Sequence, residues 1–500
     1  MNALFVYSTY DVVSFRKPFL VPEEMHLGIS YIAAVLKRAG HRVDLAVLSR
    51  MLGAGNERIL DESVSRNSPA MILFTAVTSE YDLIKRMARY MRGKRNDIYL
   101  VIGGPHASLN PEEVIMDGFD AACVGEGEYP VLELAGELEK GKRPSGIRNF
   151  YFRDGSGVER NPTRPFLEDI DGLPFPRRDI WEGWIAEREA AYHTVLLARG
   201  CPFECTYCSN HALKGLAEGK YVRMRSAGNI LTEISGLCER GPGIRNIYLE
   251  VETIGVNIAW MLDLCEKLRA LNASRANALS FGTNLRVTPV LDTDLLFEAF
   301  GKSGFRVVNI GVESGSERVR KNILKRKYSN GDIIRTVKSA RKYGIKINFY
   351  NLIGVPGETE DDIKKTIALN RECQPDKALT HIFAPYPGTA LHRACEEKGI
   401  LNKARSSGLE RTSSTLELDG LSRGKIQKYF TLFDYYVYSG KRPMASIMAI
   451  VLVKYIRSKP LLHGLYRRIT GLPWIKAVKG RLNGSLTGKT KGVTIEDTSH

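Results

Sequence analysis

The chain has 500 residues, of which 43% are hydrophobic and 26% are charged, and these proportions are typical of a globular protein with more than one domain. They exclude wholesale disorder, a fibrous repeat and a polytopic membrane protein. The formal net charge is +16, and residues 401–500 contribute +12 of it, with 18 basic and 6 acidic side chains. An anionic partner is therefore expected to bind the C-terminal region first.

The first residues predict a strand rather than a signal peptide, because no basic segment followed by an apolar one opens the chain. The longest uncharged apolar run, residues 443–453, is too short to span a bilayer. Eight cysteines are too few for a disulfide framework in a chain of this length, and five of them are scattered singly. We therefore expect a cytoplasmic protein with reduced thiols.

Residues 1–140 alternate short β-branched runs with amphipathic stretches, which predicts a parallel, doubly wound α/β sheet. Five strands are predicted, at 4–7, 43–48, 70–75, 98–102 and 121–124. Ligands of such sheets bind at the carboxyl ends of the strands, where two glycine-rich loops follow. These loops contain Gly103, Gly104, Pro105 and His106, and Gly125, Glu126 and Gly127. They are either ligand-binding loops or simply tight turns, and neither has the dinucleotide-binding pattern.

Residues 141–190 are rich in proline and glycine and predict a linker. Six βα units follow in residues 191–400 and predict a partial (β/α)6 barrel. Its strands are expected at 195–197, 246–250, 280–282, 307–310, 346–352 and 381–384. Residues 401–488 predict a mainly helical, basic C-terminal region with helices at 424–438 and 443–457, and residues 489–500 predict a disordered tail.

Three cysteines, Cys201, Cys205 and Cys208, lie in one loop directly after the first predicted barrel strand. Thiolates at these spacings can point to one centre, and soft thiolates select zinc or iron–sulfur clusters. His211 could complete a Cys3His zinc site. A [4Fe–4S] cluster would instead keep one iron without a protein ligand, open to substrate chemistry. The spacing favours the cluster over zinc, and both over a fortuitous group of thiols.

The Cys-x-x-x-Cys-x-aromatic-Cys pattern of this loop, with Tyr207 as the aromatic residue, resembles the radical S-adenosylmethionine (SAM) superfamily. The six βα units that follow agree with this resemblance. It implies that Cys201, Cys205 and Cys208 hold a [4Fe–4S] cluster whose open iron binds SAM. One electron then cleaves SAM to methionine and a 5′-deoxyadenosyl radical, and a low-potential donor such as flavodoxin or ferredoxin is expected to supply that electron.

Other segments of the predicted barrel resemble the SAM contacts of the same superfamily. Residues 311–316 resemble the segment that contacts the ribose and the methionyl part of SAM. Residues 354–359 resemble the segment beside the adenine, and they are also typical of a Pro-Gly turn before a capped helix. Glu252 matches the paired aspartates of many relatives only in charge. The resemblance assigns SAM contacts to Tyr207, Glu252, Asn284, Glu313, Ser314, Lys325, Gly354 and Pro356, with Arg286 and Arg326 as further candidates.

A doubly wound domain that precedes such a barrel resembles the cobalamin-binding subgroup, and the match covers about residues 1–400. The resemblance implies a Rossmann-like cobalamin-binding domain whose glycine-rich loops lie against the flat corrin ring, since glycine permits close backbone approach. The loop after the first strand, residues 8–14, lacks the Asp-x-His-x-x-Gly motif of cobalamin mutases. We predict that no protein histidine, neither His26 nor His106, replaces the lower axial base of the cobalamin.

These resemblances together imply a cobalamin-dependent radical SAM enzyme that methylates an unactivated carbon of a small-molecule substrate. One SAM would methylate the cobalamin and a second would form the radical, so that the cofactors carry the chemistry and the protein positions them. One alternative is a cyclase, oxygenase or rearrangement enzyme that uses the same cofactors without net methylation. The other is a non-catalytic cobalamin-binding sensor.

Residues 441–481 contain ten basic and no acidic side chains, interleaved with aliphatic and aromatic residues. This composition suits an anionic membrane surface, and a helical cap over the barrel is the alternative. No recognised nucleic-acid-binding module accompanies the charge, so we expect no nucleic acid partner. The membrane interpretation predicts an enzyme that lies peripherally on the membrane and acts on a lipid, isoprenoid or tetrapyrrole-like substrate.

Overall fold

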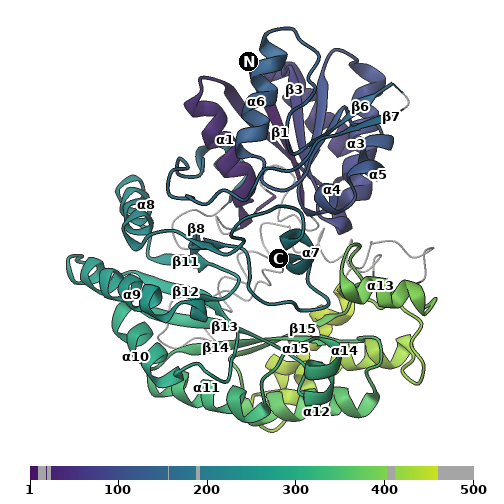
Figure 1. Ribbon diagram of the computed structural model, residues 1–500. Coiled ribbons are helices and arrows are strands. Elements are labelled where there is room, and N and C mark those ends of the chain that lie inside the picture. Colours follow the sequence, from purple (N-terminus) through teal and green to yellow (C-terminus); the bar gives the residue numbers. More distant parts are fainter. Residues whose placement is uncertain (10–17, 20–23, 156, 187–191, 402–410, 460–500) are drawn as a thin grey trace.

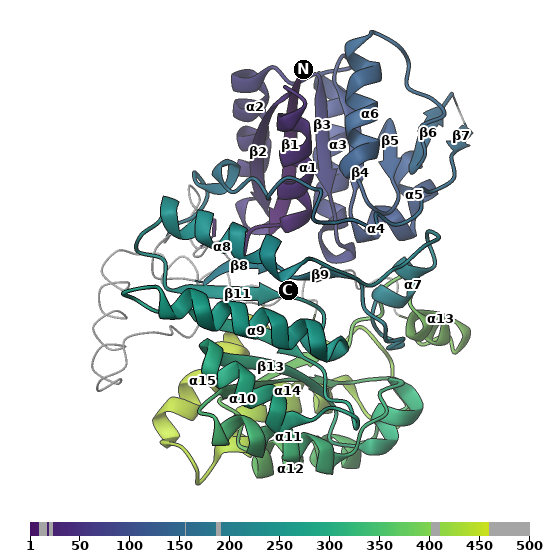
Figure 2. The same ribbon diagram turned by 60° about the vertical axis from the view of Figure 1, so that its left-hand side comes forward.

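The computed structural model describes residues 1–9, 18–19, 24–155, 157–186, 192–401 and 411–459. An N-terminal α/β domain rests on an open barrel, and the C-terminal helices pack on the side of the barrel away from it (Figures 1 and 2). Within the described residues no helix is long and apolar enough to cross a membrane. The predicted tail 489–500, most of the basic segment 441–481 and most of the loop 8–14 lie outside the described residues.

The N-terminal sheet has the strand order β2-β1-β3-β4-β5-β6-β7. Its first five strands are parallel, as the sequence predicts, and β6 and β7 continue the sheet in antiparallel pairing. The strands are β1 Asn2–Thr9, β2 Arg42–Ser49, β3 Met71–Thr75, β4 Tyr99–Gly103, β5 Ala121–Cys123, β6 Phe150–Asp154 and β7 Gly157–Arg160.

The last two strands correct the prediction of a linker over 141–190. Phe150 and Phe152 bury their rings on the sheet, while the residues between and after them are more exposed, so this short segment has the alternation of a strand. Further along, the fully buried Trp181 donates a hydrogen bond from Nε1 to Ser30 Oγ at 2.9 Å. The segment between the two domains is therefore fixed against the N-terminal domain over much of its length.

Helices cover both faces of the N-terminal sheet because consecutive residues of β1 alternate between two cores. Ala3 and Phe5 pack in the cluster that includes residues of α1 and α6, while Leu4 and Val6 pack in the cluster that includes residues of α2 and α3. The helices are α1 Leu27–Arg38, α2 Gly55–Asn67, α3 Tyr81–Lys94, α4 Pro105–Leu109, α5 Pro111–Met116 and α6 Glu128–Glu139. Burial on both faces confirms the doubly wound architecture.

The second sheet is parallel throughout, with the order β15-β14-β13-β12-β11-β8, which confirms the six βα units. Its strands are β8 Tyr192–Leu196, β11 Asn246–Glu250, β12 Ser280–Leu285, β13 Phe305–Glu313, β14 Lys346–Ile353 and β15 Lys377–Ile382, and a short antiparallel pair is formed by β9 Ala198–Arg199 and β10 Arg223–Met224. The helices are α7 Asn210–Lys214, α8 Ala227–Arg240, α9 Ile258–Ala273, α10 Thr293–Ser303, α11 Asn330–Lys342 and α12 Glu360–Cys373. Strand β15 begins four residues before the predicted 381–384, since its charged first residue hides the alternating burial that follows.

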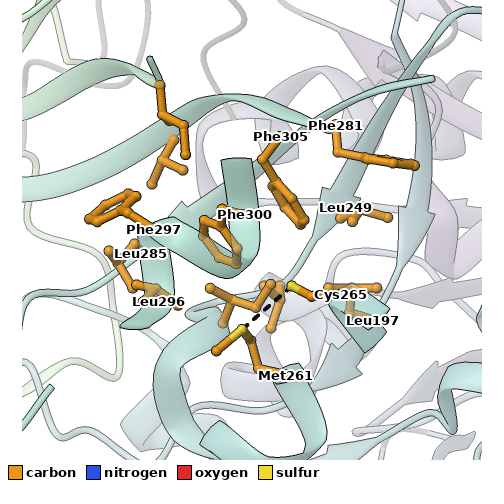
Figure 3. Close-up of a cluster of buried hydrophobic side chains, with 14 of the residues drawn as sticks. Leu197, Leu249, Met261, Cys265, Phe281, Leu285, Leu296, Phe297, Phe300 and Phe305 are labelled. Carbon is orange, nitrogen blue, oxygen red and sulfur yellow. Dashed lines mark hydrogen bonds between the residues drawn. The ribbon is translucent and has the colours of Figure 1, made fainter. Parts of the chain in front are cut away.

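The core of the barrel domain lies between the sheet and its outer helices (Figure 3). The rings of Phe300 from α10 and Phe305 from β13 stack with their centroids 4.1 Å apart. In the same core the thiol of Cys265 lies 3.6 Å from Met261 Sδ, and burial raises the pKa of this thiol to about 12. Cys265 is therefore a packing residue, far from the chemistry expected of the three-cysteine loop.

Three further helices follow the barrel: α13 Ala390–Glu397, α14 Arg423–Tyr438 and α15 Met444–Arg457. Helix α14 packs on α12 and β15, and α15 packs on α14. The two predicted helices of the C-terminal region are thus confirmed, and they cover the outer face of the last barrel strands.

Candidate active site

The carboxyl edge of the N-terminal sheet faces the three-cysteine loop of the barrel (Figure 2). The loop after β5 reaches the barrel through Glu126, which accepts hydrogen bonds from Arg199 and Arg223. Helix α4, which follows β4, packs against α7, which follows the cysteine loop. The two glycine-rich loops and the cysteines are therefore brought to one junction between the domains.

Contacts at Gly200 and at Thr206 hold the cysteine loop in place. Gly200 has φ = +80°, and a Cβ atom there would lie 2.2 Å from the carbonyl oxygen of Tyr221. Thr206 donates from Oγ1 to the carbonyl of Ile323 at 2.6 Å, and its own carbonyl accepts from the N–H of Leu391 at 2.8 Å. The loop is thus fixed by contacts with two separate parts of the barrel and with α13.

Replacing Gly200 with alanine is expected to prevent metal loading at the cysteine loop, because the new methyl group collides with backbone and the residue must keep a left-handed conformation. The iron content of the purified variant should fall at least tenfold. Gly215→Ala is the matched control, since a Cβ atom there makes only an ordinary contact, 3.5 Å from the carbonyl of Ala212. Normal iron content in Gly200→Ala would contradict this account.

The side chains around the described thiols do not form a closed Cys3His zinc site. His211 accepts the backbone N–H of Ala390 at its Nε2, 3.2 Å away, so its ring is engaged with the start of α13. Among the described residues, no three Cys, His, Asp or Glu side chains are gathered closely enough for a single ion. A cubane binds each thiolate at a different iron and accepts a wider spacing. Arg286 and Asn210 point N–H groups at Cys205 Sγ and Cys208 Sγ, which are 2.7 and 3.7 Å away.

Burial favours the neutral form of two of the three thiols, those of Cys201 and Cys208. Burial, with a smaller contribution from the charge of Glu252, raises the pKa of Cys208 to about 11, and burial also raises the pKa of Cys201. Metal binding must therefore displace protons from these thiols. Glu252 itself is exposed and lies close enough to influence both cysteines through its charge.

The predicted SAM contacts Tyr207 and Glu313 meet at a single buried guanidinium. Arg326 donates from Nη1 to Tyr207 Oη at 2.8 Å and to Glu313 Oε1 at 3.0 Å, and from Nη2 to the carbonyl of Gly311 at 2.7 Å. Glu313 has φ = +62° at a shift in register between β13 and β14, which turns it out of the strand. Lys325, by contrast, is exposed, so the cation that holds Glu313 is Arg326.

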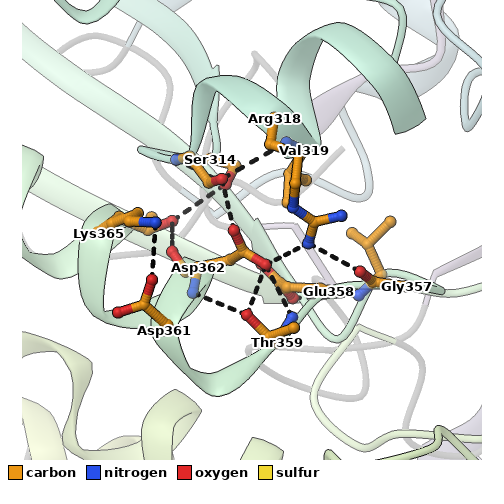
Figure 4. A network of polar contacts seen from close by, with 12 residues as sticks. Ser314, Arg318, Val319, Gly357, Glu358, Thr359, Asp361, Asp362 and Lys365 are labelled. Atoms are coloured by element: carbon orange, nitrogen blue, oxygen red, sulfur yellow. Dashed lines mark hydrogen bonds and ion pairs between the residues drawn. The ribbon is translucent and has the colours of Figure 1, made fainter.

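One polar network joins the two segments expected to contact SAM (Figure 4). Asp362, in the first turn of α12, accepts from Ser316 Oγ at 2.6 Å and from the guanidinium of Arg318. Thr359 caps the same helix and donates from Oγ1 to Asp362 at 2.7 Å, which confirms the capped helix predicted after the Pro-Gly turn. Ser314 is fully buried within this framework. These bonds fix the backbone of both segments.

The turn between β14 and α12 contains a buried carboxyl group. Glu358 accepts the backbone N–H groups of Gly354 and Val355 at its Oε2, 2.6 and 3.2 Å away, while its Oε1 is buried without a hydrogen-bond partner. Gly354 has φ = +77°, and Pro356 is buried in the same turn. Burial raises the pKa of Glu358 from 4.5 to about 8, so the carboxyl is protonated at neutral pH.

Glu358 should make the protein less stable as pH rises. Between pH 4.5 and 8 the unfolded chain loses this proton and the folded protein keeps it, so the free energy of unfolding falls by up to about 1.4 kcal/mol per pH unit. Glu358→Gln is expected to remove that slope. The free energy of unfolding of the variant should therefore rise relative to that of the wild type between pH 5 and pH 8. Urea unfolding at several pH values measures the difference. Glu397→Gln, which removes an exposed carboxylate, is the control, and parallel profiles for Glu358→Gln and wild type would contradict the prediction.

Polar side chains form a ladder on the inner side of the barrel sheet. Asn284, Asn309 and Asn348 are register partners on three adjacent strands. Asn348 donates to Asn309 Oδ1 at 2.9 Å, Asn309 donates to Tyr248 Oη at 2.7 Å, and Tyr248 donates to Asn284 Oδ1 at 2.6 Å. Only Asn284 is identified from the sequence. The signal for the others is a polar residue in the middle of otherwise apolar strands.

The glycine-rich loops form a close-fitting edge at the ends of β4 and β5. Gly103 ends β4, and Pro105 begins α4. Between them Gly104 has φ = +91°, and a Cβ atom there would lie 2.7 Å from Thr75 Oγ1. Gly125 also has a positive φ, +84°, and a Cβ atom at Gly127 would lie 3.0 Å from a side chain of α1. Glycine is therefore required at Gly104 and favoured at Gly127 by packing within the domain, and contact of these loops with a flat ring stays a prediction.

Both histidines near this edge make contacts within the N-terminal domain. His106 is buried, its ring centroid is 4.0 Å from that of Tyr81, and burial lowers its pKa to about 4. His26 caps α1 by accepting the N–H of Ile29 at 3.2 Å. That no protein histidine ligates the cobalt stays a prediction, and both rings have structural roles that agree with it.

Glu126 is predicted to contact the cofactor, but its carboxylate is directed to the barrel. Its oxygens lie 2.9 Å from Arg199 Nη1 and 2.9 Å from Arg223 Nη1, and Oε2 also accepts the N–H of Leu167 at 2.9 Å. Burial alone would raise the pKa of Glu126, but the two guanidinium groups hold it below its usual value. Arg199 precedes Cys201 by only two residues and also pairs with Glu128. The sequence gives no local signal for this pairing.

Comparison with known proteins agrees with this geometry. The model of the radical SAM superfamily matches residues 195–369, and the model of the B12 binding domain matches residues 21–135. An uncharacterized methyltransferase of Pyrococcus horikoshii is 27% identical over 73% of this chain and 77% of its own length. The anaerobic magnesium-protoporphyrin IX monomethyl ester cyclase of Rubrivivax gelatinosus is 25% identical over 74% and 66%. The cobalamin-dependent SAM radical enzyme OxsB, solved with aqua-cobalamin and SAM, has the same fold, with a TM-score of 0.65 at 14% identity over 98% of this chain and 82% of its own.

Proposed function

Because the chain belongs to the radical SAM superfamily and carries an N-terminal B12-binding domain, we propose that it transfers a methyl group to an unactivated carbon of a small-molecule substrate. Its cofactors are a [4Fe–4S] cluster, SAM and cobalamin. The observation that carries the proposal is the junction at which the carboxyl edge of the N-terminal sheet meets the three-cysteine loop through Glu126 and Arg199. Similarity to a protein named as a methyltransferase supports the choice of reaction.

Different residues of this chain would position the cluster, SAM and cobalamin. When bound, the cluster and SAM supply a 5′-deoxyadenosyl radical and cobalamin supplies a methyl group. We assign Cys201, Cys205 and Cys208 to the cluster. The contact of Arg326 with Tyr207 and Glu313 would orient SAM through the Glu313 carboxylate, which suits ribose hydroxyl groups. Gly104 and its neighbouring loop would lie against the corrin ring.

We propose that the polar ladder of the barrel sheet lines the substrate pocket. It consists of Tyr248, Asn284, Asn309 and Asn348. It presents a row of donors and acceptors whose directions are fixed by their mutual hydrogen bonds. A fixed polar row of this kind selects a substrate with hydrogen-bonding groups along one side, as a carboxylated or amide-bearing molecule has. The substrate would enter between the ladder and the junction with the N-terminal domain.

The reaction is tested by incubating the reduced, reconstituted protein with methyl-deuterated SAM and a small-molecule extract from a deletion strain. A product that carries the deuterated methyl group, together with 5′-deoxyadenosine, is the expected result. Formation of 5′-deoxyadenosine with an unmethylated product would favour the cyclase-like alternative, which the Rubrivivax relative supports. No 5′-deoxyadenosine from a preparation that contains cluster and cobalamin would favour a sensor. A low-potential one-electron donor is required, and we propose flavodoxin or ferredoxin for this role.

A second proposal is that α15 contacts an anionic membrane surface. Met444, Met448, Leu452 and Tyr455 are exposed along one side of the helix, while Ile447 and Val451 on the other side are buried against α14. Exposed lysines precede and follow the helix, at 441 and 459. Basic residues beside an apolar stripe suit anionic lipids, at about 1 kcal/mol for each basic residue near the surface.

Co-sedimentation with phosphatidylglycerol vesicles at low salt tests this contact. The wild type is expected to sediment with these vesicles and to stay in solution with phosphatidylcholine alone. Met448→Glu together with Leu452→Glu should reduce the bound fraction at least threefold. Equal binding of the two proteins, or none by the wild type, would remove the membrane proposal and would leave the proposed reaction untouched.

A further inference from the structure

Arg286 lies directly after β12 and carries a buried guanidinium to the middle cysteine of the loop. Its Nη1 is 2.7 Å from Cys205 Sγ, and the residue is 9% exposed. The guanidinium carbon is 3.8 Å from the centroid of the Phe203 ring, within the range of a cation–π contact. The backbone N–H of Arg286 donates to Thr253 Oγ1 at 2.9 Å. The ring contact thus holds the guanidinium near the sulfur, and the hydrogen bond to Thr253 fixes the backbone from which it extends.

The charge of Arg286 needs an anion that the other described residues do not provide. None of the ion pairs among them includes Arg286, although its guanidinium is always protonated. A buried cation without an opposite charge is costly, because desolvation is not repaid by attraction. The thiolate of Cys205, once deprotonated by a metal, is the anion within reach. The buried guanidinium of Arg286 is therefore better matched by a thiolate at Cys205 than by a neutral thiol.

We propose that Arg286 is a positioning residue that donates a hydrogen bond to the Cys205 thiolate and raises the reduction potential of the cluster. The inference rests on the proposed cluster at the three cysteines and goes beyond the proposed reaction. One electron from the low-potential donor reduces the cluster and adds one negative charge to it, while the donor loses that electron. A fixed cation at 2.7 Å stabilises the more negative, reduced state more than the oxidised one.

The test is a redox titration of the reconstituted protein without SAM, followed by electron paramagnetic resonance of the reduced cluster. Arg286→Gln and Arg286→Met remove the charge, and Arg286→Lys retains it on a flexible point donor. In Arg286→Met the equilibrium constant for reduction is expected to fall about tenfold, which equals about 59 mV for one electron. Arg286→Lys should fall between Arg286→Met and wild type. Arg306→Gln, an exposed arginine on the neighbouring strand β13, removes the same charge at a distance and should leave the potential unchanged.

The possible results separate the inference from the proposed function. Equal potentials in wild type and in every Arg286 variant that assembles a cluster would overturn the role of Arg286. Loss of the cluster from all three variants would also overturn it, in favour of a purely structural role. A wild type without any cluster signal after reconstitution would instead refute the proposed cluster itself. A potential lowered in Arg286→Gln and Arg286→Met, and partly restored by lysine, would support the inference.

Discussion

Replacing Cys201, Cys205 and Cys208 together with alanine is expected to abolish formation of 5′-deoxyadenosine from SAM and to remove the iron from the purified protein. The three thiols lie in a single loop that is fixed by contacts with distant parts of the chain. The reduction in turnover should exceed a thousandfold, because the one-electron cleavage of SAM is assigned to the cluster that these thiols would hold. Chromatography of the reaction mixture and iron analysis measure the two losses.

The matched control is Cys238→Ala, which removes a buried thiol from α8 on the outer side of the barrel. This variant should keep both iron and turnover and lose only packing free energy, on the order of 1 kcal/mol. The triple variant should still bind cobalamin, since the N-terminal sheet has its own two cores. Turnover that survives in the triple variant would refute the radical SAM assignment of these cysteines. Loss of cobalamin binding as well would show that the fold, rather than the cluster, was damaged.

The architecture could be predicted from the sequence because its signals are local. In β1, alternate residues enter different cores, and in α3 the buried residues recur at helical spacing, so each segment carries its own pattern. The signal of the cysteine loop is also local, since all three cysteines lie within eight consecutive residues. Strands β6 and β7 escape prediction because they are short and lie among prolines and glycines, which mask the alternation of Phe150 and Phe152.

The parts of the site that the sequence does not predict depend on pairs of residues far apart in the chain. Arg326 meets Tyr207 across 119 positions, and Arg286 meets Cys205 across 81. Nothing near an arginine in the sequence tells which anion it will approach after folding. The same limit explains Glu126, whose glycine-rich surroundings suggest a cofactor contact and whose carboxylate binds the other domain.

Breaking the contact between Glu126 and Arg199 is expected to weaken the attachment of the cobalamin domain to the cluster loop. Glu126→Gln leaves Arg223, which is only 3% exposed, without its carboxylate, and removing one partner of a buried pair costs about 3–5 kcal/mol. Arg199→Gln leaves Glu126 paired with Arg223 but removes the cation from the buried Glu128, so its cost should be comparable. In a double-mutant cycle the coupling free energy between Glu126 and Arg199 should be about 1–3 kcal/mol. Urea unfolding of the four proteins measures it.

The pair Arg143 and Asp154 is the control, since its atoms are 2.8 Å apart, against 2.9 Å for Arg199 and Glu126, but both of its side chains are more than 60% exposed. Such exposed pairs contribute about 0–1 kcal/mol. Cobalamin titration then decides what Glu126 does. If Glu126 acts by holding the domains together, its effect on cobalamin affinity should largely disappear once Arg199 and Arg223 have both been replaced with glutamine, because these are the two guanidinium groups with which it pairs. If Glu126 instead touched the corrin, Glu126→Gln would lower the affinity equally in both backgrounds. The cycle therefore separates contact with the cofactor from alignment of the two domains that hold it.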